Sequence, residues 1–129
     1  MAAIAAHRLD VTPVWLLLVG PPSSAKTELI QLTRTITHVN FLSDLTQNTL
    51  ASGYTQEGKS AQVAQDTTSL LARVPDGILA IKDFTTVLSK RSEARAEVLA
   101  QLREVHDGSF DKSWGTGKTL SWTGRISLI

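Results

Sequence analysis

The chain of 129 residues contains no cysteine, which excludes disulfide bonds and thiolate metal sites. Aromatic residues make up only 5% of it, and the formal net charge is only +1. The overall charge therefore does not indicate a protein that binds nucleic acid or anionic membranes through a strongly basic surface. Hydrophobic residues make up 42%, which is enough for a single core, so we expect one domain over residues 1–129.

Long apolar runs are also missing. The longest, residues 14–19, is far too short to cross a bilayer. The alanine-rich start is interrupted by charged residues at positions 8 and 10 and lacks the basic region of a targeting signal. We therefore expect a cytoplasmic protein with no membrane partner. The three histidines, His7, His38 and His106, are too scattered along the sequence to indicate a metal site from their spacing.

What the sequence does contain is a phosphate-loop pattern directly after that apolar run, in VWLLLVGPPSSAKTELI. Lys26 and Thr27 follow Gly20 by six and seven positions, which is the GxxxxGK[ST] spacing. Ala25 occupies the place of the second glycine, and a positive φ there would cost on the order of 1 kcal/mol. We predict a nucleoside triphosphate site formed by Gly20, Pro21, Pro22, Ser23, Ser24, Ala25, Lys26 and Thr27.

The chemistry of a triphosphate explains this pattern. A polyanion needs several donors that converge on one concave spot, and a loop that leads into a helix supplies backbone N–H groups for it. In this arrangement Lys26 places its ammonium group over the β- and γ-phosphates, and the Thr27 hydroxyl ligates Mg²⁺. The expected cofactors are ATP and Mg²⁺. A second glycine-lysine sequence, WGTGKT, has Lys112 where the first glycine belongs, so it predicts a turn instead.

Hydrophobic periodicity predicts strands that alternate with helices. The predicted strands are 14–19, buried on both faces, then 39–45, 78–81 and 125–129. The predicted helices are 26–37, with Leu29, Ile30, Thr33 and Ile36 on one face; 63–74; and one from Ser92 to just before Gly108, with Val98, Leu99, Leu102 and Val105 facing the core. The remaining predictions are a loop over 46–59, a tight turn at 75–77, and a hairpin over 109–122 that turns at 115–117.

Alternating strands and helices predict an α/β fold with a mainly parallel sheet, in which ligands bind beyond the carboxyl ends of the strands. Gly20 and Asp83 both follow such ends. Asp83 is the acid available to complete a magnesium site at this edge, and we favour that role for it. A different register puts Lys82 in the magnesium position and Asp83 in the water-orienting position, and a third interpretation is that Asp83 only begins a turn.

These residues give the chain a resemblance to P-loop ATPases of the AAA+ type, and more narrowly to uncharacterised ATPases of phages and mobile elements. The similar motifs are GPPSSAKTELI, FLSDLTQNTLASGY, LLARVPDGILAIKDFTTVLS and LREVHDGSFDKSWG, and only the first is specific by itself. The resemblance implies a P-loop NTPase three-layer sandwich. It also implies a role in coupling ATP hydrolysis to the remodelling of nucleic acid or protein, as in phage or mobile-element replication.

The resemblance further implies that the hairpin 109–122 contacts DNA, with Trp114 and Trp122 near Lys112, Lys118 and Arg125, although packing of the two tryptophans across the strands explains them equally well. A homo-oligomeric ring would need an arginine that reaches the neighbouring subunit's nucleotide. Arg103 is our first choice for this catalytic role, with Arg91, Arg95 and Arg125 as the other candidates. A solvated helix face is the simpler explanation for each.

Two departures from the family pattern limit these expectations. Ala25 replaces glycine, and the sequence stops at Ile129, near the strand that would carry sensor 1, so we expect an incomplete AAA+ core. Phe84 stands where a second acid is expected. Alternatives to an ATPase are therefore a small-molecule phosphotransferase of the kinase type and an ATP-binding remnant without turnover. The hairpin stands in place of a kinase lid and favours the ATPase.

Overall fold

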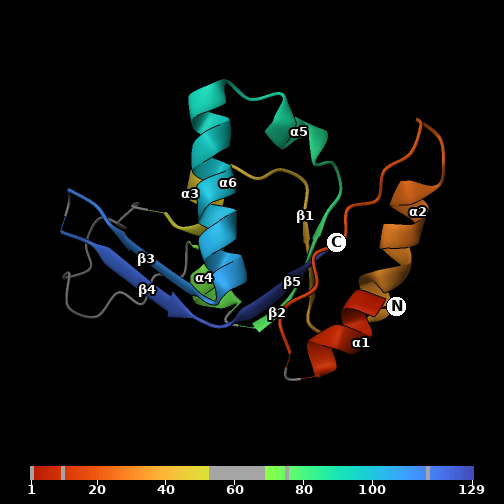
Figure 1. Ribbon diagram of the computed structural model, residues 1–129, viewed down its shortest axis with the longest axis horizontal. Coiled ribbons are helices and arrows are strands. Elements are labelled where there is room, and N and C mark those ends of the chain that lie inside the picture. Colours follow the sequence, from red (N-terminus) through yellow and green to blue (C-terminus); the bar gives the residue numbers. More distant parts are fainter. Residues whose placement is uncertain (1, 10, 53–68, 75, 116) are drawn as a thin grey trace.

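The computed structural model describes residues 2–9, 11–52, 69–74, 76–115 and 117–129. Its centre is a parallel sheet of three strands in the order β1-β2-β5 (Figure 1). The strands are β1 (Val39–Leu42), β2 (Asp76–Ile81) and β5 (Arg125–Leu128). Val39 pairs with Ile78 and Ile78 pairs with Ser127, so the three strands start at the same edge. This confirms an α/β fold.

The buried strands follow their hydrophobic sequence. The last five residues of β2 are all buried, and Ile126 and Ser127 of β5 are fully inaccessible. The core extends to the hairpin, where Phe110 and Trp122 form a cross-strand pair and both are buried. The hairpin consists of β3 (Ser109–Ser113) and β4 (Thr119–Thr123), as predicted. Its turn has Gly117 at φ 78°, a conformation that glycine adopts without strain.

The longest helix, α6 (Ser92–Asp107), crosses in front of the sheet and packs against β5 and β3 (Figure 1). Val98, Leu102 and Val105 face the core as predicted, but Leu99 is 41% exposed, so its assignment to the core face was wrong. Gly108 ends the helix at φ 87°, in the left-handed conformation expected of the residue after a helix. Ser92 is the first helical residue and Arg91 holds the cap position, one residue earlier than predicted.

Three predictions along the middle of the chain need correction. The loop predicted for 46–59 contains the short helix α3 (Gln47–Leu50), whose capping box joins Thr46 and Thr49. Asp76 and Gly77 begin β2 instead of closing a turn, and Pro75 lies outside the described residues. Of the helix predicted over 63–74, the described part forms α4 (Leu70–Arg73), while Val63 and Thr67 lie outside it.

The strand predicted over 14–19 differs most from the structure. Only its first residues pair with β5: the amide of Leu16 donates to the Leu128 carbonyl at 2.8 Å, and Trp15 forms a single parallel bridge with Leu128. Leu17, Leu18 and Val19 are 64%, 41% and 86% exposed. This segment therefore lies at the margin of the described sheet instead of in its buried centre.

The helix predicted over 26–37 is shorter and changes its geometry. It forms α2 (Lys26–Gln31), followed by a 3₁₀ turn, η1 (Leu32–Thr35). Ile30 is the buried residue of α2, whereas Leu29 is 54% exposed, so the predicted apolar face is only partly correct. The helix α1 (Ala2–Arg8) packs against β2 and β5, and α5 (Thr85–Leu88) is a short helix that the sequence did not predict.

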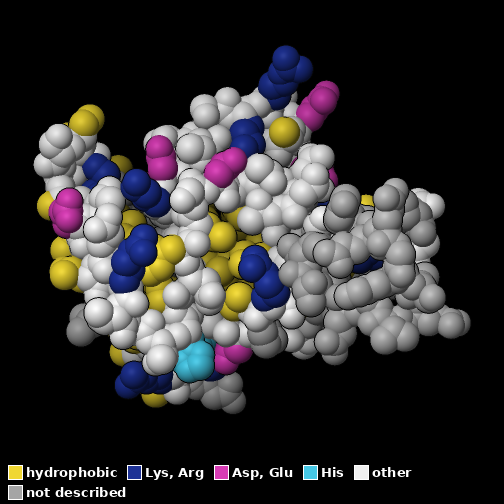
Figure 2. All heavy atoms as spheres, turned by 180° about the vertical axis from the view of Figure 1, so that it is seen from behind, with side chains coloured by type: hydrophobic (Ala, Val, Ile, Leu, Met, Phe, Trp, Pro, Cys, Tyr) yellow, Lys and Arg dark blue, Asp and Glu magenta, His cyan; other side chains and the backbone are white. Residues whose placement is uncertain are grey.

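Two further features are the hydrophobic side chains on one surface and the limited length of the helices. On the side turned away from the view of Figure 1, hydrophobic side chains gather near the centre of the surface and are bordered by Lys and Arg side chains (Figure 2). None of the helices in the described ranges combines the length and hydrophobicity that a membrane span requires.

Candidate functional site

The loop predicted to bind phosphate follows the segment 14–16, which pairs with β5. The Trp15 ring fixes the preceding segment: its Nε1 donates to the Ile126 carbonyl at 3.0 Å, and the ring meets His106 of α6 edge-on at a centroid distance of 5.1 Å. The chain then curls through two residues in the left-handed conformation, Ser23 at φ 61° and Ala25 at φ 58°. Ala25 caps α2 directly before Lys26. The sequence motif therefore correctly marked residue 25 as the position with a left-handed backbone conformation, which glycine adopts most easily.

Lys26 folds back into this loop. Its Nζ donates to the Gly20 carbonyl at 2.9 Å, to the Pro21 carbonyl at 2.6 Å and to Ser24 Oγ at 3.0 Å. All three partners are neutral oxygens of the loop itself, and none is a carboxylate. These bonds engage all three N–H donors of the ammonium group, but no carboxylate neutralises its charge, and an anion that binds would exchange for these loop oxygens. A side chain on Gly20 would bring a Cβ within 2.9 Å of Ser24 Oγ, so the glycine makes room for the closed curl.

A cavity of about 280 Å³ lies beside the loop, at the carboxyl end of the sheet. It joins the loop to the ends of β2 and β5, which confirms that Gly20 and Asp83 share one edge. Its walls are largely apolar, formed by residues such as Leu17, Ile30 and Phe84. The polar side chains on its lining are Lys26, Thr27, Lys82, Asp83 and Thr85.

Asp83 has two functions in this arrangement. Its Oδ1 accepts hydrogen bonds from Thr85 Oγ1 at 2.5 Å and from the Thr85 amide at 2.9 Å, and these bonds begin α5. Thr86 Oγ1 also donates to the Asp83 carbonyl. The hydrogen bond from the Thr85 side chain is the main reason why the pKa of Asp83 lies below 3.8. Asp83 therefore both starts a turn and presents an ionised carboxylate to the cavity.

Magnesium, which the motif implies, finds few protein ligands here. Within the described residues, no group of three or more His, Asp or Glu side chains is placed to hold a metal ion. The Thr27 hydroxyl and the Asp83 carboxylate line the same cavity and are the two oxygen donors that fit Mg²⁺. Magnesium commonly uses one or two carboxylates and completes its shell with phosphate oxygens and water. These two residues therefore fit the ion only together with a phosphate ligand.

Arg103, the first candidate for the arginine that contacts the transferred phosphate, is not among the residues that line this cavity. It is exposed on α6. Of the other candidates, Arg95 Nη1 donates to the Leu88 carbonyl at 2.9 Å. Arg125 donates to the carbonyls of Leu9 and His7, at 2.6 and 2.7 Å, and so ties the end of α1 to the sheet. Within one chain, the structure therefore brings none of these three guanidinium groups to the loop.

The hairpin does not display its two tryptophans together. Trp122 is only 6% exposed and faces the core, which for this residue favours cross-strand packing over the stacking of a base. Trp114 is partly buried, with Lys112 Nζ and Lys118 Nζ each 5.8 Å from its ring centroid. Lys112 pairs with Glu97 at 3.4 Å, and Lys118 donates to the Ser52 carbonyl at 2.9 Å. Cross-strand packing therefore explains this cluster.

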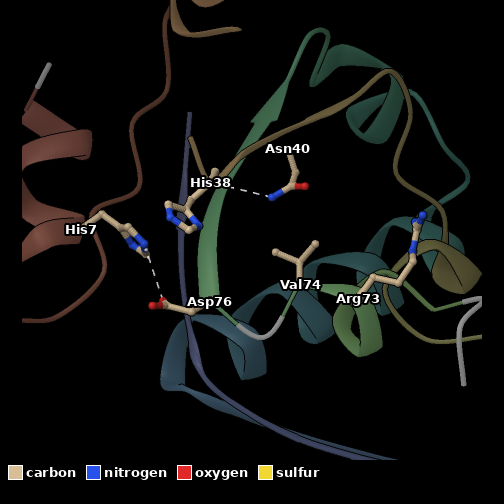
Figure 3. A pocket seen from close by; sticks show the side chains of 6 residues that line it. All are labelled: His7, His38, Asn40, Arg73, Val74 and Asp76. Atoms are coloured by element: carbon tan, nitrogen blue, oxygen red, sulfur yellow. Dashed lines mark hydrogen bonds and ion pairs between the residues drawn. The ribbon is translucent and has the colours of Figure 1, made fainter. Parts of the chain in front are cut away.

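A second cavity, of about 470 Å³, was not predicted from the sequence (Figure 3). It lies at the opposite edge of the sheet, where β1 and β2 begin. His7 and His38, which are far apart in sequence, both line it, and His7 Nε2 is 3.6 Å from Asp76 Oδ1. Spacing along the chain could not reveal this pair, because the sheet brings the two residues together. The cavity lacks a glycine-rich loop, and so we place the candidate site at the other edge.

Comparisons of the chain with family models, with curated proteins and with solved structures find no match.

Proposed function

We propose that this chain is the nucleotide-binding domain of an AAA+-like P-loop ATPase and that the loop 20–27 binds the phosphates of ATP. The observation that carries the proposal is the position of Lys26 Nζ. It is held inside a closed loop by neutral oxygens and lies on the lining of a cavity next to Thr27 and Asp83. Neutral partners stabilise the ammonium group without cancelling its charge, so the loop attracts a polyanion.

The remaining parts of the proposal follow from the same site. ATP would place its phosphates against Lys26, and Mg²⁺ would be held between them by Thr27 and Asp83. An aspartate is ionised at neutral pH, and the hydrogen bonds from Thr85 lower the pKa of Asp83 further below its usual value. We also propose that ATP hydrolysis drives the remodelling of nucleic acid or protein in a ring of subunits. This rests on the resemblance of the motifs and on the three-layer P-loop sandwich that they imply.

Substitution of Lys26 tests the binding site. We expect Lys26→Ala to weaken the binding of a fluorescent ATP analogue by about 100-fold, because charge-assisted hydrogen bonds to phosphate contribute about 1.5–3 kcal/mol and the loop loses its only ammonium group. Affinity is measured by fluorescence titration, and circular dichroism confirms that the variant is folded.

Lys90→Ala is the matched control. Lys90 pairs with Asp44 at 3.5 Å and does not line the cavity, so its loss should leave the affinity unchanged. If the Lys26 variant binds the analogue as tightly as the Lys90 variant does, the loop is not a phosphate site and the proposed function is wrong.

A further inference from the structure

Lys82 is the residue of the cavity that the proposed function does not use. It directly follows β2, and its amide donates to the Leu42 carbonyl at 3.0 Å, which fixes its backbone at the carboxyl edge of the sheet. Its side chain lines the cavity that Lys26 and Asp83 also line. Within the described part of the chain, Lys82 Nζ makes no hydrogen bond and no ion pair within 4.0 Å, although its charge helps to lower the pKa of the neighbouring Asp83.

The charges around the cavity are unbalanced. Among the described residues that line it, the ionisable side chains are two ammonium groups, on Lys26 and Lys82, and one carboxylate, on Asp83, and Ile129 also lies on the lining. The two hydrogen bonds from Thr85 already engage Oδ1 of that carboxylate. These side chains carry one more positive than negative charge, which suits a phosphate ligand.

We propose that Lys82 is a second phosphate-binding cation, which contacts the phosphate nearest the end of β2 and takes over much of the charge neutralisation that Mg²⁺ usually supplies. This inference rests on the proposed nucleotide site. It makes the substrate of that site a nucleoside triphosphate that binds with little dependence on divalent metal. The ammonium group is a mobile point charge on a long stem, so it can follow the phosphate without a fixed geometry.

The experiment measures ATP affinity by isothermal titration calorimetry, with Mg²⁺ and with EDTA in its place. For the unaltered protein we expect the two dissociation constants to differ by less than about threefold. Lys82→Ala should weaken binding in EDTA by about tenfold or more, the effect expected of one lost charge-assisted contact. Lys82→Arg should restore most of that affinity, and Lys90→Ala should leave it unchanged.

Two additional arms separate the contributions of charge and metal. Inorganic tripolyphosphate, which has no base or sugar, should compete with ATP in EDTA and should compete less well against the Lys82→Ala variant. Asp83→Asn should remove the small effect of Mg²⁺ while leaving the affinity in EDTA equal or higher, because it removes the one acidic side chain among the described lining residues.

The outcomes distinguish this inference from the proposed function. If the unaltered protein binds ATP only when Mg²⁺ is present, or if Lys82→Ala binds ATP in EDTA as tightly as the Lys90 control, the role of Lys82 is refuted while the nucleotide site stands. If the unaltered protein binds ATP under neither condition, the proposed function fails, and the inference fails with it.

Discussion

At Ala25 the backbone has φ 58° and ψ 16°, a left-handed conformation that a β-carbon makes unfavourable. Ser23, two residues earlier, is also left-handed at φ 61°. The loop thus holds two strained residues close to Lys26. One of them, Ala25, stands in the place where the ordinary motif has a glycine. Backbone strain of this kind persists only where surrounding contacts maintain it. Here the three hydrogen bonds of Lys26 Nζ to the loop provide such contacts.

Replacing Ala25 with glycine should therefore stabilise the protein. We expect Ala25→Gly to raise the free energy of unfolding by up to about 1 kcal/mol, because the relief of strain exceeds the added flexibility of the unfolded chain. Urea denaturation measures the change. Ala100→Gly, at an exposed position inside α6, is the matched control and should lower the same quantity by about 1 kcal/mol. An equal decrease in the free energy of unfolding of both variants would contradict the strain at Ala25.

The residues of the loop could be predicted from the sequence because their chemistry depends on close spacing along the chain. Gly20, Lys26 and Thr27 lie within eight positions, and their pattern has a local physical meaning. Lys82 could not be assigned in the same way. Its proposed part in the site depends on which strand lies opposite the loop and on the hydrogen bonds that occupy Asp83.

Among the elements, the hairpin shows how one pattern can support two interpretations. Alternating apolar and polar residues predicted β3 and β4 correctly, and the same tryptophans also suggested a surface for stacking bases. The register decides between these interpretations, because Trp122 pairs with Phe110 on the side that faces the core. A sequence shows which residues alternate, but the packing of α6 against β3 and of α4 against β4 determines which face of the hairpin is covered.

The two tryptophans should therefore differ in their effect on stability. We expect Trp122→Ala to lower the free energy of unfolding by about 3–5 kcal/mol, the cost of removing a large buried side chain from a core. Trp114→Ala should cost clearly less, because Trp114 is only partly buried near the turn. Chemical denaturation followed by circular dichroism measures both. A loss for Trp114→Ala as large as that for Trp122→Ala would show that the hairpin does not pack as described.

For the whole molecule, the alternation of strands and helices was sufficient to predict a parallel sheet with Gly20 and Asp83 at the same edge. It was not sufficient to predict the position of residues 14–19. An apolar run reflects the hydrophobicity of its own residues, whereas burial on both faces depends on neighbouring elements far away in sequence. The prediction for helix α2 was partly wrong for a similar reason, since Ile30 is its buried residue and the apolar side chain of Leu29 faces solvent.

The arrangement of the whole chain also affects the rate at which it can hydrolyse ATP. Hydrolysis needs a group that orients the attacking water and a cation that stabilises the leaving charge, and an arginine in that place is worth about 10³–10⁵ in rate. Among the described residues, Asp83 is the only acid on the cavity lining, Phe84 follows it, and Arg103 is exposed on α6. Within the described residues, a single chain therefore brings neither a second acidic side chain nor Arg103 to the cavity lining.

We expect the monomeric protein to release phosphate from ATP at less than about 0.01 s⁻¹, roughly 10³-fold below a typical enzyme. Phosphate release is measured on a monomeric size-exclusion fraction, with Lys26→Ala as the background. If Arg103 acts on the nucleotide of a neighbouring subunit, the rate per chain should rise with protein concentration, and Arg103→Ala should abolish that rise while leaving ATP affinity unchanged. Fast release from a dilute monomer would instead mean that a single chain completes the catalytic site.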